Sequence, residues 1–257
     1  MWDAAQYLRF GGERSRPFFD LLSRVGAQTP DYVADLGCGP GNLTAMLGER
    51  WPGAEIVGVD NSPEMIAAAR DANGPSPRLS FVLGDVRAWR PARPPDVLVC
   101  NAVLQWVPGH EDLLVRWADQ LAPGGWLAFQ LPGNFDQPSH VILREMAGTP
   151  RWKALIGDVE LNRQGGDPRE YAELLLRPGY EVDAWETSYV HILRGEHPVA
   201  EWAKGTTLRP VLAVLDDEQA AAFLAEYGER LRAAYHPGPF GTFFPFRRLF
   251  TVVHRLT

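Results

Sequence analysis

The sequence predicts a single α/β domain built on a doubly wound, mostly parallel sheet. Three observations favour this fold. Short apolar runs alternate with helical patterns over residues 32–131. The first run leads directly into a glycine turn, Gly37–Gly41. Distinctive polar residues follow the ends of several runs, where ligands bind in open parallel sheets. With 257 residues and 46% hydrophobic content, the chain is long enough for one large core.

The apolar runs predict five strands, at residues 33–36, 56–59, 79–83, 97–100 and 127–131. Before the first strand we expect a helix that Ser15 caps, with Pro17 in its first turn. Ser62 and Pro63 predict the start of another helix. A further helix carries Leu113, Leu114, Trp117 and Leu121 on one face, and it ends before 123–125.

Beyond Pro132 the regular alternation stops. Residues 134–177 predict an insertion over the carboxyl edge of the sheet, and its helical pieces are 140–146 and 170–176. Further on we expect an alternating strand, a mainly helical stretch, a loop and a final strand, at 181–193, 196–235, 237–241 and 249–256. The whole chain is then one domain, with a core of about 30–133, 181–193 and 247–257 and a helical substrate cap of 1–28, 134–180 and 194–246.

Composition narrows the possible partners and location. A net charge of -7 argues against nucleic acid or an anionic membrane surface as a partner. The six histidines and two cysteines have no metal-ligand spacing, so we expect no metal. There is no signal-peptide pattern, and no apolar run approaches the ~18 residues of a membrane span. These features predict a cytoplasmic protein.

The glycine spacing indicates which cofactor the turn binds. Dinucleotide sites usually have G-x-G-x-x-G, whereas Gly37, Gly39 and Gly41 are separated by single residues. Asp35 would also repel a pyrophosphate and suits a cationic group better. Asp60 follows the second apolar run, where an acid can accept hydrogen bonds from both ribose hydroxyls.

The run 35–41, Asp60, the triplet 84–86 and the segment 121–125 together resemble the class I S-adenosylmethionine-dependent methyltransferases. The resemblance implies S-adenosyl-L-methionine as cofactor, S-adenosyl-L-homocysteine as product, and a Rossmann-like seven-stranded sheet whose last strand, 249–256, is inserted antiparallel. It places the adenine amino group at Asp85 and the methionine tail along the glycine turn. The cofactor-binding residues that it implies are Asp35, Gly37, Gly39, Asp60, Asn61, Met65, Asp85, Val86 and Asn101.

A closer resemblance spans nearly the whole chain. Segments 13–17, 101–106, 208–210 and 248–250 are similar to the bacterial trans-aconitate 2-methyltransferases, which esterify one carboxylate of trans-aconitate. Residues 148–166 match the family least, so the resemblance implies no substrate contacts for that segment.

An anionic acceptor also fits the chemistry. A carboxylate with a pKa of ~4 is already ionised at neutral pH, so methyl transfer to it needs no catalytic acid or base. The site needs positioning groups instead, and arginines can hold a carboxylate through two hydrogen bonds. Arg209 is the strongest candidate because its sequence neighbours are apolar. The alternative to a substrate contact is an arginine in a structural ion pair. The substrate-binding candidates are Tyr7, Arg14, Gln105, Trp106, Tyr189, His191, Arg209 and Arg248.

Other functions stay open from the sequence. Residues 101–106 are shared loosely with carboxyl methyltransferases that act on malonyl-acyl carrier protein. A cofactor-binding module without catalysis and a nicotinamide-dependent oxidoreductase are the remaining alternatives, and the glycine spacing argues against the second. Monomer and homodimer are both compatible with the sequence.

Overall fold

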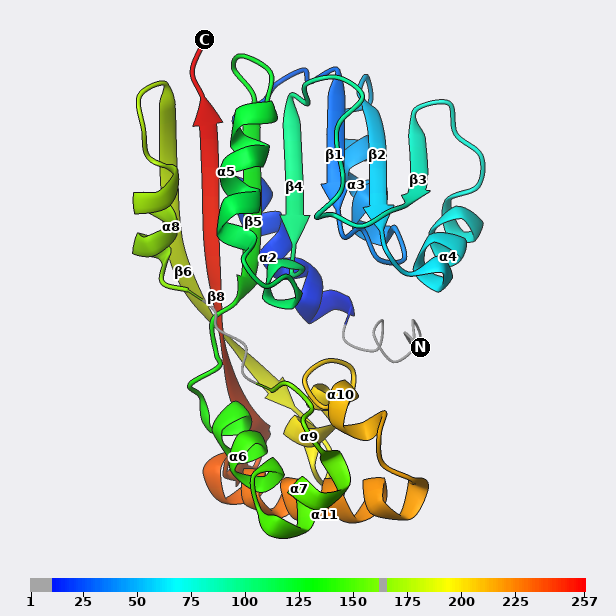
Figure 1. Ribbon diagram of the computed structural model, residues 1–257, viewed down its shortest axis with the longest axis vertical. Coiled ribbons are helices and arrows are strands. Elements are labelled where there is room, and N and C mark those ends of the chain that lie inside the picture. The colour runs from blue at the N-terminus through cyan, green and yellow to red at the C-terminus, as the bar shows by residue number, and fades with distance from the viewer. Residues whose placement is uncertain (1–10, 162–165) are drawn as a thin grey trace. The chain divides into compact units, whose positions relative to one another are not determined.

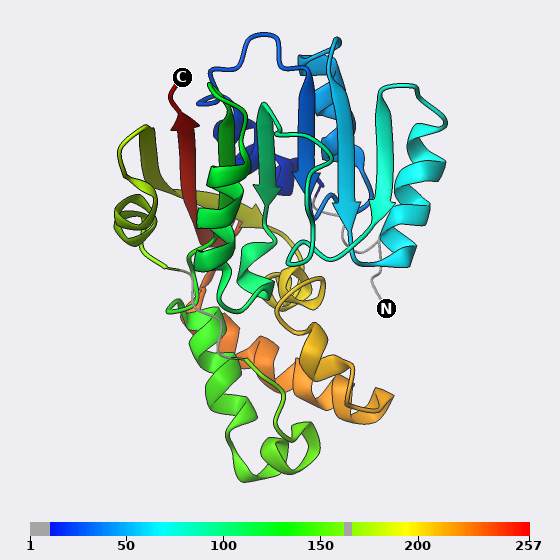
Figure 2. The same ribbon diagram turned by 45° about the horizontal axis from the view of Figure 1, so that its top comes forward.

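The computed structural model describes residues 11–161 and 166–257, and the side chains of residues 15–161 and 166–257. The chain forms two compact units. Unit 1 comprises Met1–Leu131, Gly166–Glu186 and Leu249–Thr257, and unit 2 comprises Pro132–Gly165 and Thr187–Arg248. Figures 1 and 2 show their elements.

The sheet has the strand order β3-β2-β1-β4-β5-β8-β6, and β7 pairs with β8. Neighbours among the first five strands are parallel, as the partners of Ala34 show: Val57 on one side and Leu98 on the other. Figure 1 shows β8 running opposite to β5 and β6. The predicted sheet with an inserted antiparallel last strand is therefore confirmed. The strands are β1 (Tyr32–Leu36), β2 (Glu55–Asp60), β3 (Leu79–Leu83), β4 (Val97–Asn101), β5 (Trp126–Pro132), β6 (Tyr180–Leu193), β7 (Pro237–Gly238) and β8 (Gly241–Arg255).

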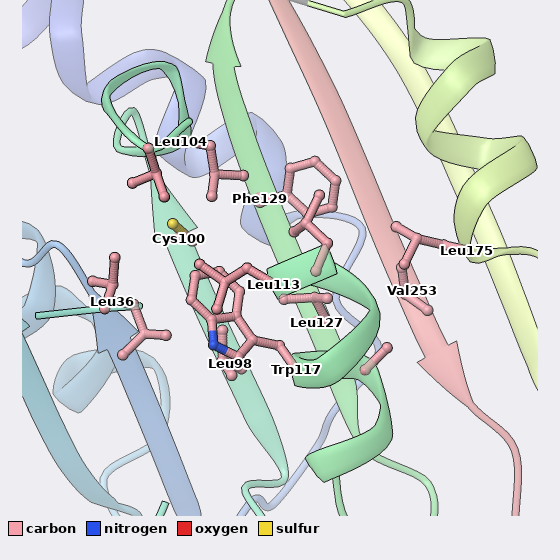
Figure 3. Packing of buried hydrophobic residues seen from close by; sticks show 14 of the residues in the cluster. Leu36, Leu98, Cys100, Leu104, Leu113, Trp117, Leu127, Phe129, Leu175 and Val253 are labelled. Carbon is pink, nitrogen blue, oxygen red and sulfur yellow. The ribbon is translucent and has the colours of Figure 1, made fainter. Parts of the chain in front are cut away.

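Helices cover both faces of the sheet in unit 1. In Figure 1, α5 lies in front of the sheet and α2 and α3 lie behind it. The front face is a core in which Leu98, Trp117 and Phe129 are fully buried (Figure 3). The helices of unit 1 are α2 (Gly11–Leu22), α3 (Asn42–Arg50), α4 (Pro63–Asn73), η1 (Leu104–Trp106), α5 (His110–Gln120) and α8 (Pro168–Leu175).

Helix α8 differs from the sequence-based expectation, which placed it in the cap over 134–180. Leu175 is fully buried in the core of unit 1 (Figure 3), and the Tyr171 ring meets the edge of Phe129 at 5.3 Å. The Tyr171 hydroxyl also lies 2.8 Å from His110 Nε2. The apolar face of α8 therefore packs on the sheet and on α5 rather than on a cap.

Helix α2 begins earlier than predicted. Ser15 and Pro17 lie inside the helix, not at its first turn, because the helix begins at Gly11. Proline is favoured in the first turn of a helix, so Ser15 and Pro17 predict a start here. In the structure the helix already extends over the polar residues before Pro17. Phe18 and Leu21 on its apolar face are fully buried.

Unit 2 is mainly helical and carries the ends of two long strands. Its helices are α6 (Pro138–Ala147), α7 (Pro150–Ile156), α9 (Pro198–Lys204), α10 (Arg209–Leu212) and α11 (Asp217–Ala234). The sequence analysis did not predict α7. It also treated 237–241 as a loop and began the last strand at 249, whereas β8 begins at Gly241 and pairs with β7. The segment 241–248 alternates as a strand does, since Phe244 and Phe246 are buried and Phe243 is exposed. Across the described residues no helix is both long and apolar enough to cross a membrane.

Candidate active site

The glycine turn after β1 is a left-handed loop fixed by its neighbours. Gly37, Gly39 and Gly41 have φ angles of 80°, 55° and 77°, which side chains with a Cβ rarely adopt. The Gly37 and Cys38 amides both donate to the Val59 carbonyl, at 2.7 and 3.0 Å. The turn is therefore tied to the carboxyl end of β2, and α3 begins directly after it at Asn42.

The three glycines face different surroundings. A Cβ on Gly37 would lie 2.0 Å from Val103 Cγ2, and one on Gly41 would lie 2.8 Å from Ala69 and Phe81. Both positions are close packing contacts. A Cβ on Gly39 would meet nothing within 4 Å. Only the middle glycine therefore borders open space, which is the arrangement needed for close approach of a ligand to the backbone.

Asp60, at the end of β2, is held by two backbone amides. Gly39 N donates to Asp60 Oδ2 at 3.0 Å, and Ser62 N donates to Oδ1 at 2.9 Å. Each carboxylate oxygen still has a second lone pair, so the side chain can accept further hydrogen bonds from a ligand. Asp60 is half-buried and thus accessible.

Asp35 is a buried carboxyl beneath the turn. It is 2% exposed, and its Oδ2 accepts a 2.6 Å hydrogen bond from Thr44 Oγ1 of α3. The pKa of Asp35 is raised to about 6, mainly because the carboxyl is buried; the Thr44 hydrogen bond opposes this shift, and the nearby Asp60 charge adds to it. A cation beside Asp35 would favour its ionised form, as expected for a residue that faces an ammonium group.

Asp85, beyond β3, pairs with an arginine that the sequence analysis did not consider. Arg87 donates to both Asp85 oxygens, through Nε at 3.0 Å to each, and this pair lowers the pKa of Asp85. The pair is exposed, so its Arg87 side can be displaced at little cost. The backbone connects this end to the site, since Gly84 N donates to the Asp60 carbonyl at 2.9 Å.

The remaining predicted cofactor residues lie around the same edge. Asn61 is exposed, whereas Met65 and Val86 are buried, at 4% and 7% exposure. Met65 N donates to Ser62 Oγ at 3.2 Å, which makes Ser62 the cap of α4. This confirms the helix start predicted from Ser62 and Pro63.

Asn101 ends β4, next to β1, where the strand order changes direction. Such a switch point is where open parallel sheets bind ligands. Asn101 Oδ1 accepts a 2.6 Å hydrogen bond from Gln130 Nε2 of β5. Gln105 Nε2 donates to the Ala102 carbonyl at 2.7 Å, and Gln105 Oε1 is buried without a partner among the described residues. Ala102 and Gln130 were not predicted as site residues. The sequence does not reveal the positive φ of Ala102, although it lies in the segment 101–106, and Gln130 belongs to no recognisable motif.

In unit 2, two predicted substrate residues share one aromatic cluster. The His191 ring stacks on Trp202 at 4.6 Å and lies 6.1 Å from Phe246. The Arg248 guanidinium lies 4.7 Å from the centre of the same Phe246 ring. Arg248 is only 8% exposed and His191 6%, so a guanidinium and an imidazole are both buried in this cluster.

The other predicted substrate residues belong to both units. Tyr189 is buried in β6 and Arg209 is half-buried at the start of α10, both in unit 2. Gln105 and Trp106 belong to unit 1. Arg14 lies in α2 but its side chain is outside the described set, and Tyr7 is outside the described residues altogether. In the described part of the chain no group of three or more His, Cys, Asp or Glu side chains could hold a metal ion.

Comparison with known proteins identifies the family. A family model described as a methyltransferase domain matches residues 33–125. A trans-aconitate 2-methyltransferase of Streptomyces avermitilis is 53% identical over 260 residues, which cover 99% of this chain and 97% of the relative. The chain belongs to the trans-aconitate 2-methyltransferase family. A family member from Mycobacterium tuberculosis is 50% identical over 98% of this chain and 96% of its own length.

The fold of this chain is similar to the folds of solved structures. The phosphoethanolamine N-methyltransferase 2 of Haemonchus contortus, in complex with S-adenosylhomocysteine, superposes with a TM-score of 0.56 at 14% identity, covering 93% of this chain and 52% of that one. The YcgJ protein of Bacillus subtilis has the same TM-score and identity and is covered over 97% of its length. These matches confirm the predicted fold. The methyltransferase-domain match and membership of the trans-aconitate 2-methyltransferase family confirm the predicted S-adenosylmethionine-dependent methyltransferase.

The geometry of unit 1 fits the cofactor of this family. Open space at Gly39 allows a ligand to lie against the backbone, and Asp60 beside it has lone pairs for ribose hydroxyls. The buried carboxyl of Asp35 supplies negative charge beneath the turn. A pyrophosphate would instead meet two carboxyl groups, which disfavours a dinucleotide.

Proposed function

We propose that the chain transfers the methyl group of S-adenosylmethionine to one carboxylate of trans-aconitate, forming a methyl ester and S-adenosylhomocysteine. The single observation that carries the proposal is the 53% identity to a named trans-aconitate 2-methyltransferase over 99% of the chain. The acceptor is thus a small polycarboxylate.

Residues of unit 1 are assigned to the cofactor. Gly37 and Gly39 supply the backbone cradle, Asp60 the ribose contacts and Asp85 the adenine contact, while Asp35 balances the positive charge of the methionine ammonium. Asn61, Met65, Val86 and Asn101 complete this set. The bound cofactor supplies an electrophilic methyl group on a sulfonium.

The predicted substrate residues are assigned to the acceptor. Arg248 is the central candidate because its guanidinium is buried beside His191 and Phe246 and can hold a carboxylate through two parallel hydrogen bonds. His191 can donate a hydrogen bond to a second carboxylate from the same cluster. The acceptor carboxylate is already ionised, so these residues orient it and exclude water without moving a proton. Tyr7, Arg14, Gln105, Trp106, Tyr189 and Arg209 complete the proposed acceptor set.

The test is an assay of the purified chain with labelled S-adenosylmethionine and a panel of free acids and malonyl-acyl carrier protein. We expect methyl ester formation with trans-aconitate. Methylation of the carrier-bound acid alone would replace this proposal by the carrier-protein alternative, and cofactor binding without any product would favour a non-catalytic module.

A further inference from the structure

The corner that follows β4 holds a strained backbone. Ala102 has a φ of 58° and is the only non-glycine residue with a positive φ in the part of the chain that the structure describes. The left-handed conformation costs an ordinary residue roughly 1–2 kcal/mol. Such strain persists only where the surroundings fix it, and it concentrates at ligand sites.

Three hydrogen bonds fix this corner. Ala102 N donates to the Gln130 carbonyl at 2.9 Å, and Gln105 Nε2 donates to the Ala102 carbonyl at 2.7 Å. The third bond runs from the Gln130 side chain, which is 1% exposed, to Asn101 Oδ1 at 2.6 Å. The corner also abuts the glycine turn, since Val103 fills the space where a Cβ on Gly37 would lie.

The bond from Gln130 decides which end of the Asn101 amide faces a ligand. An asparagine side chain has an acceptor oxygen and a donor NH2 group. Gln130 occupies Oδ1, while Nδ2 has no partner among the described residues and Asn101 is half-buried. The group left for a ligand is a donor, which suits a carboxylate oxygen and not an ammonium group.

We infer that Gln130 is a positioning residue that orients Asn101 so that Asn101 Nδ2 binds a carboxylate oxygen of a ligand. The inference rests on the proposed function, which provides two such carboxylates: one on the amino-acid end of the cofactor and one on the acceptor. Either carboxylate could accept a hydrogen bond from Asn101 Nδ2, and the experiment below distinguishes the cofactor carboxylate from the acceptor carboxylate.

A double-mutant cycle of Asn101→Ala and Gln130→Met tests the inference. The dissociation constant of S-adenosylhomocysteine is measured by calorimetry, and the KM for trans-aconitate by methyl ester formation. We expect each single variant to raise one of these constants about tenfold, which corresponds to about 1.4 kcal/mol. Because Gln130 acts through Asn101, Gln130→Met should have no further effect on that constant in the Asn101→Ala background.

Asn101→Asp keeps an acceptor for Gln130 but loses the donor. It should therefore raise the same constant at least as much as Asn101→Ala does. A merely structural role for Gln130 predicts a different result: a lower Tm and an equal effect of Gln130→Met in both backgrounds. That result, or wild-type behaviour of Asn101→Asp, overturns the inference. If the wild-type chain does not methylate trans-aconitate, the proposed function fails, and the calorimetric cycle alone decides the role of Gln130.

Discussion

Gly39 offers a substitution that separates ligand binding from folding. In Gly39→Ala the added methyl group meets no protein atom within 4 Å, and it projects into the open space beside Asp60. Gly109 is a matched control: its φ of 67° resembles the 55° of Gly39 and lies in the left-handed region, its Cβ also meets nothing within 4 Å, and it directly precedes α5. The two alanine variants share the backbone cost and differ in position alone.

The expected magnitudes follow from this comparison. An alanine in the left-handed region loses roughly 1–2 kcal/mol, so both variants should melt about 2–8 °C below the wild type, at about 2–4 °C per kcal/mol for a chain of this size. Only the methyl group at position 39 displaces a cofactor lying against the turn. We expect Gly39→Ala to weaken S-adenosylhomocysteine binding at least tenfold, or about 1.4 kcal/mol.

Isothermal titration calorimetry with S-adenosylhomocysteine and thermal melts of the three proteins measure both quantities. Gly109→Ala should bind S-adenosylhomocysteine with the wild-type dissociation constant. Equal dissociation constants for Gly39→Ala and the wild type would refute the placement of the cofactor at Gly39, whatever the melting temperatures are.

Three further predictions concern single carboxyl and guanidinium groups. Burial raises the pKa of Asp35 to about 6, above the ~3.9 of an unfolded chain, so ionisation destabilises the folded state as pH rises from about 4 to about 6, by about 3 kcal/mol at 1.36 kcal/mol per pH unit. Asp35→Asn should therefore gain stability relative to the wild type across that window in urea unfolding, and a pH-independent difference would contradict this. Asp60→Asn replaces one acceptor of the Gly39 and Ser62 amides by a donor, so S-adenosylhomocysteine affinity should fall at least tenfold, about 1.4 kcal/mol. Arg248→Met should raise the KM for trans-aconitate about 10–100-fold, from a charged hydrogen bond of about 1.5–3 kcal/mol, and leave S-adenosylhomocysteine affinity unchanged; an unchanged KM would remove Arg248 from the acceptor site.

The sheet was predictable because its signals are local. Each buried parallel strand is a short apolar run, and the glycine turn marks the end of the first strand in the sequence itself. The start of α4 at Ser62 and Pro63 follows from capping chemistry in the same way.

The errors arise where tertiary contacts decide. Nothing in residues 168–175 distinguishes a cap helix from one that packs on the sheet. Tertiary contacts assign α8 to the core, among them the contact of Tyr171 with Phe129 and the burial of Leu175. The early start of β8 was hidden by Pro245, which is tolerated there because it lies on the exposed face of the strand.

Candidate site residues with a local sequence signal were predictable, and those that depend on tertiary contacts were not. Asp60 was predictable from its place after a strand, and Gly39 from the glycine spacing. Gln130 was not, because the role that we propose for it depends on a hydrogen bond to a residue 29 positions away on the neighbouring strand. The Arg87 partner of Asp85 was equally invisible, since arginines close in sequence to an acid are common and most are solvated.

The most direct test of the central claim is a single assay: wild-type protein, labelled S-adenosylmethionine and trans-aconitate, with the product identified by mass spectrometry. The claim predicts a monomethyl ester of trans-aconitate and a stoichiometric amount of S-adenosylhomocysteine. Cofactor turnover with malonyl-acyl carrier protein but not with trans-aconitate, or no ester with any di- or tricarboxylic acid, would contradict it.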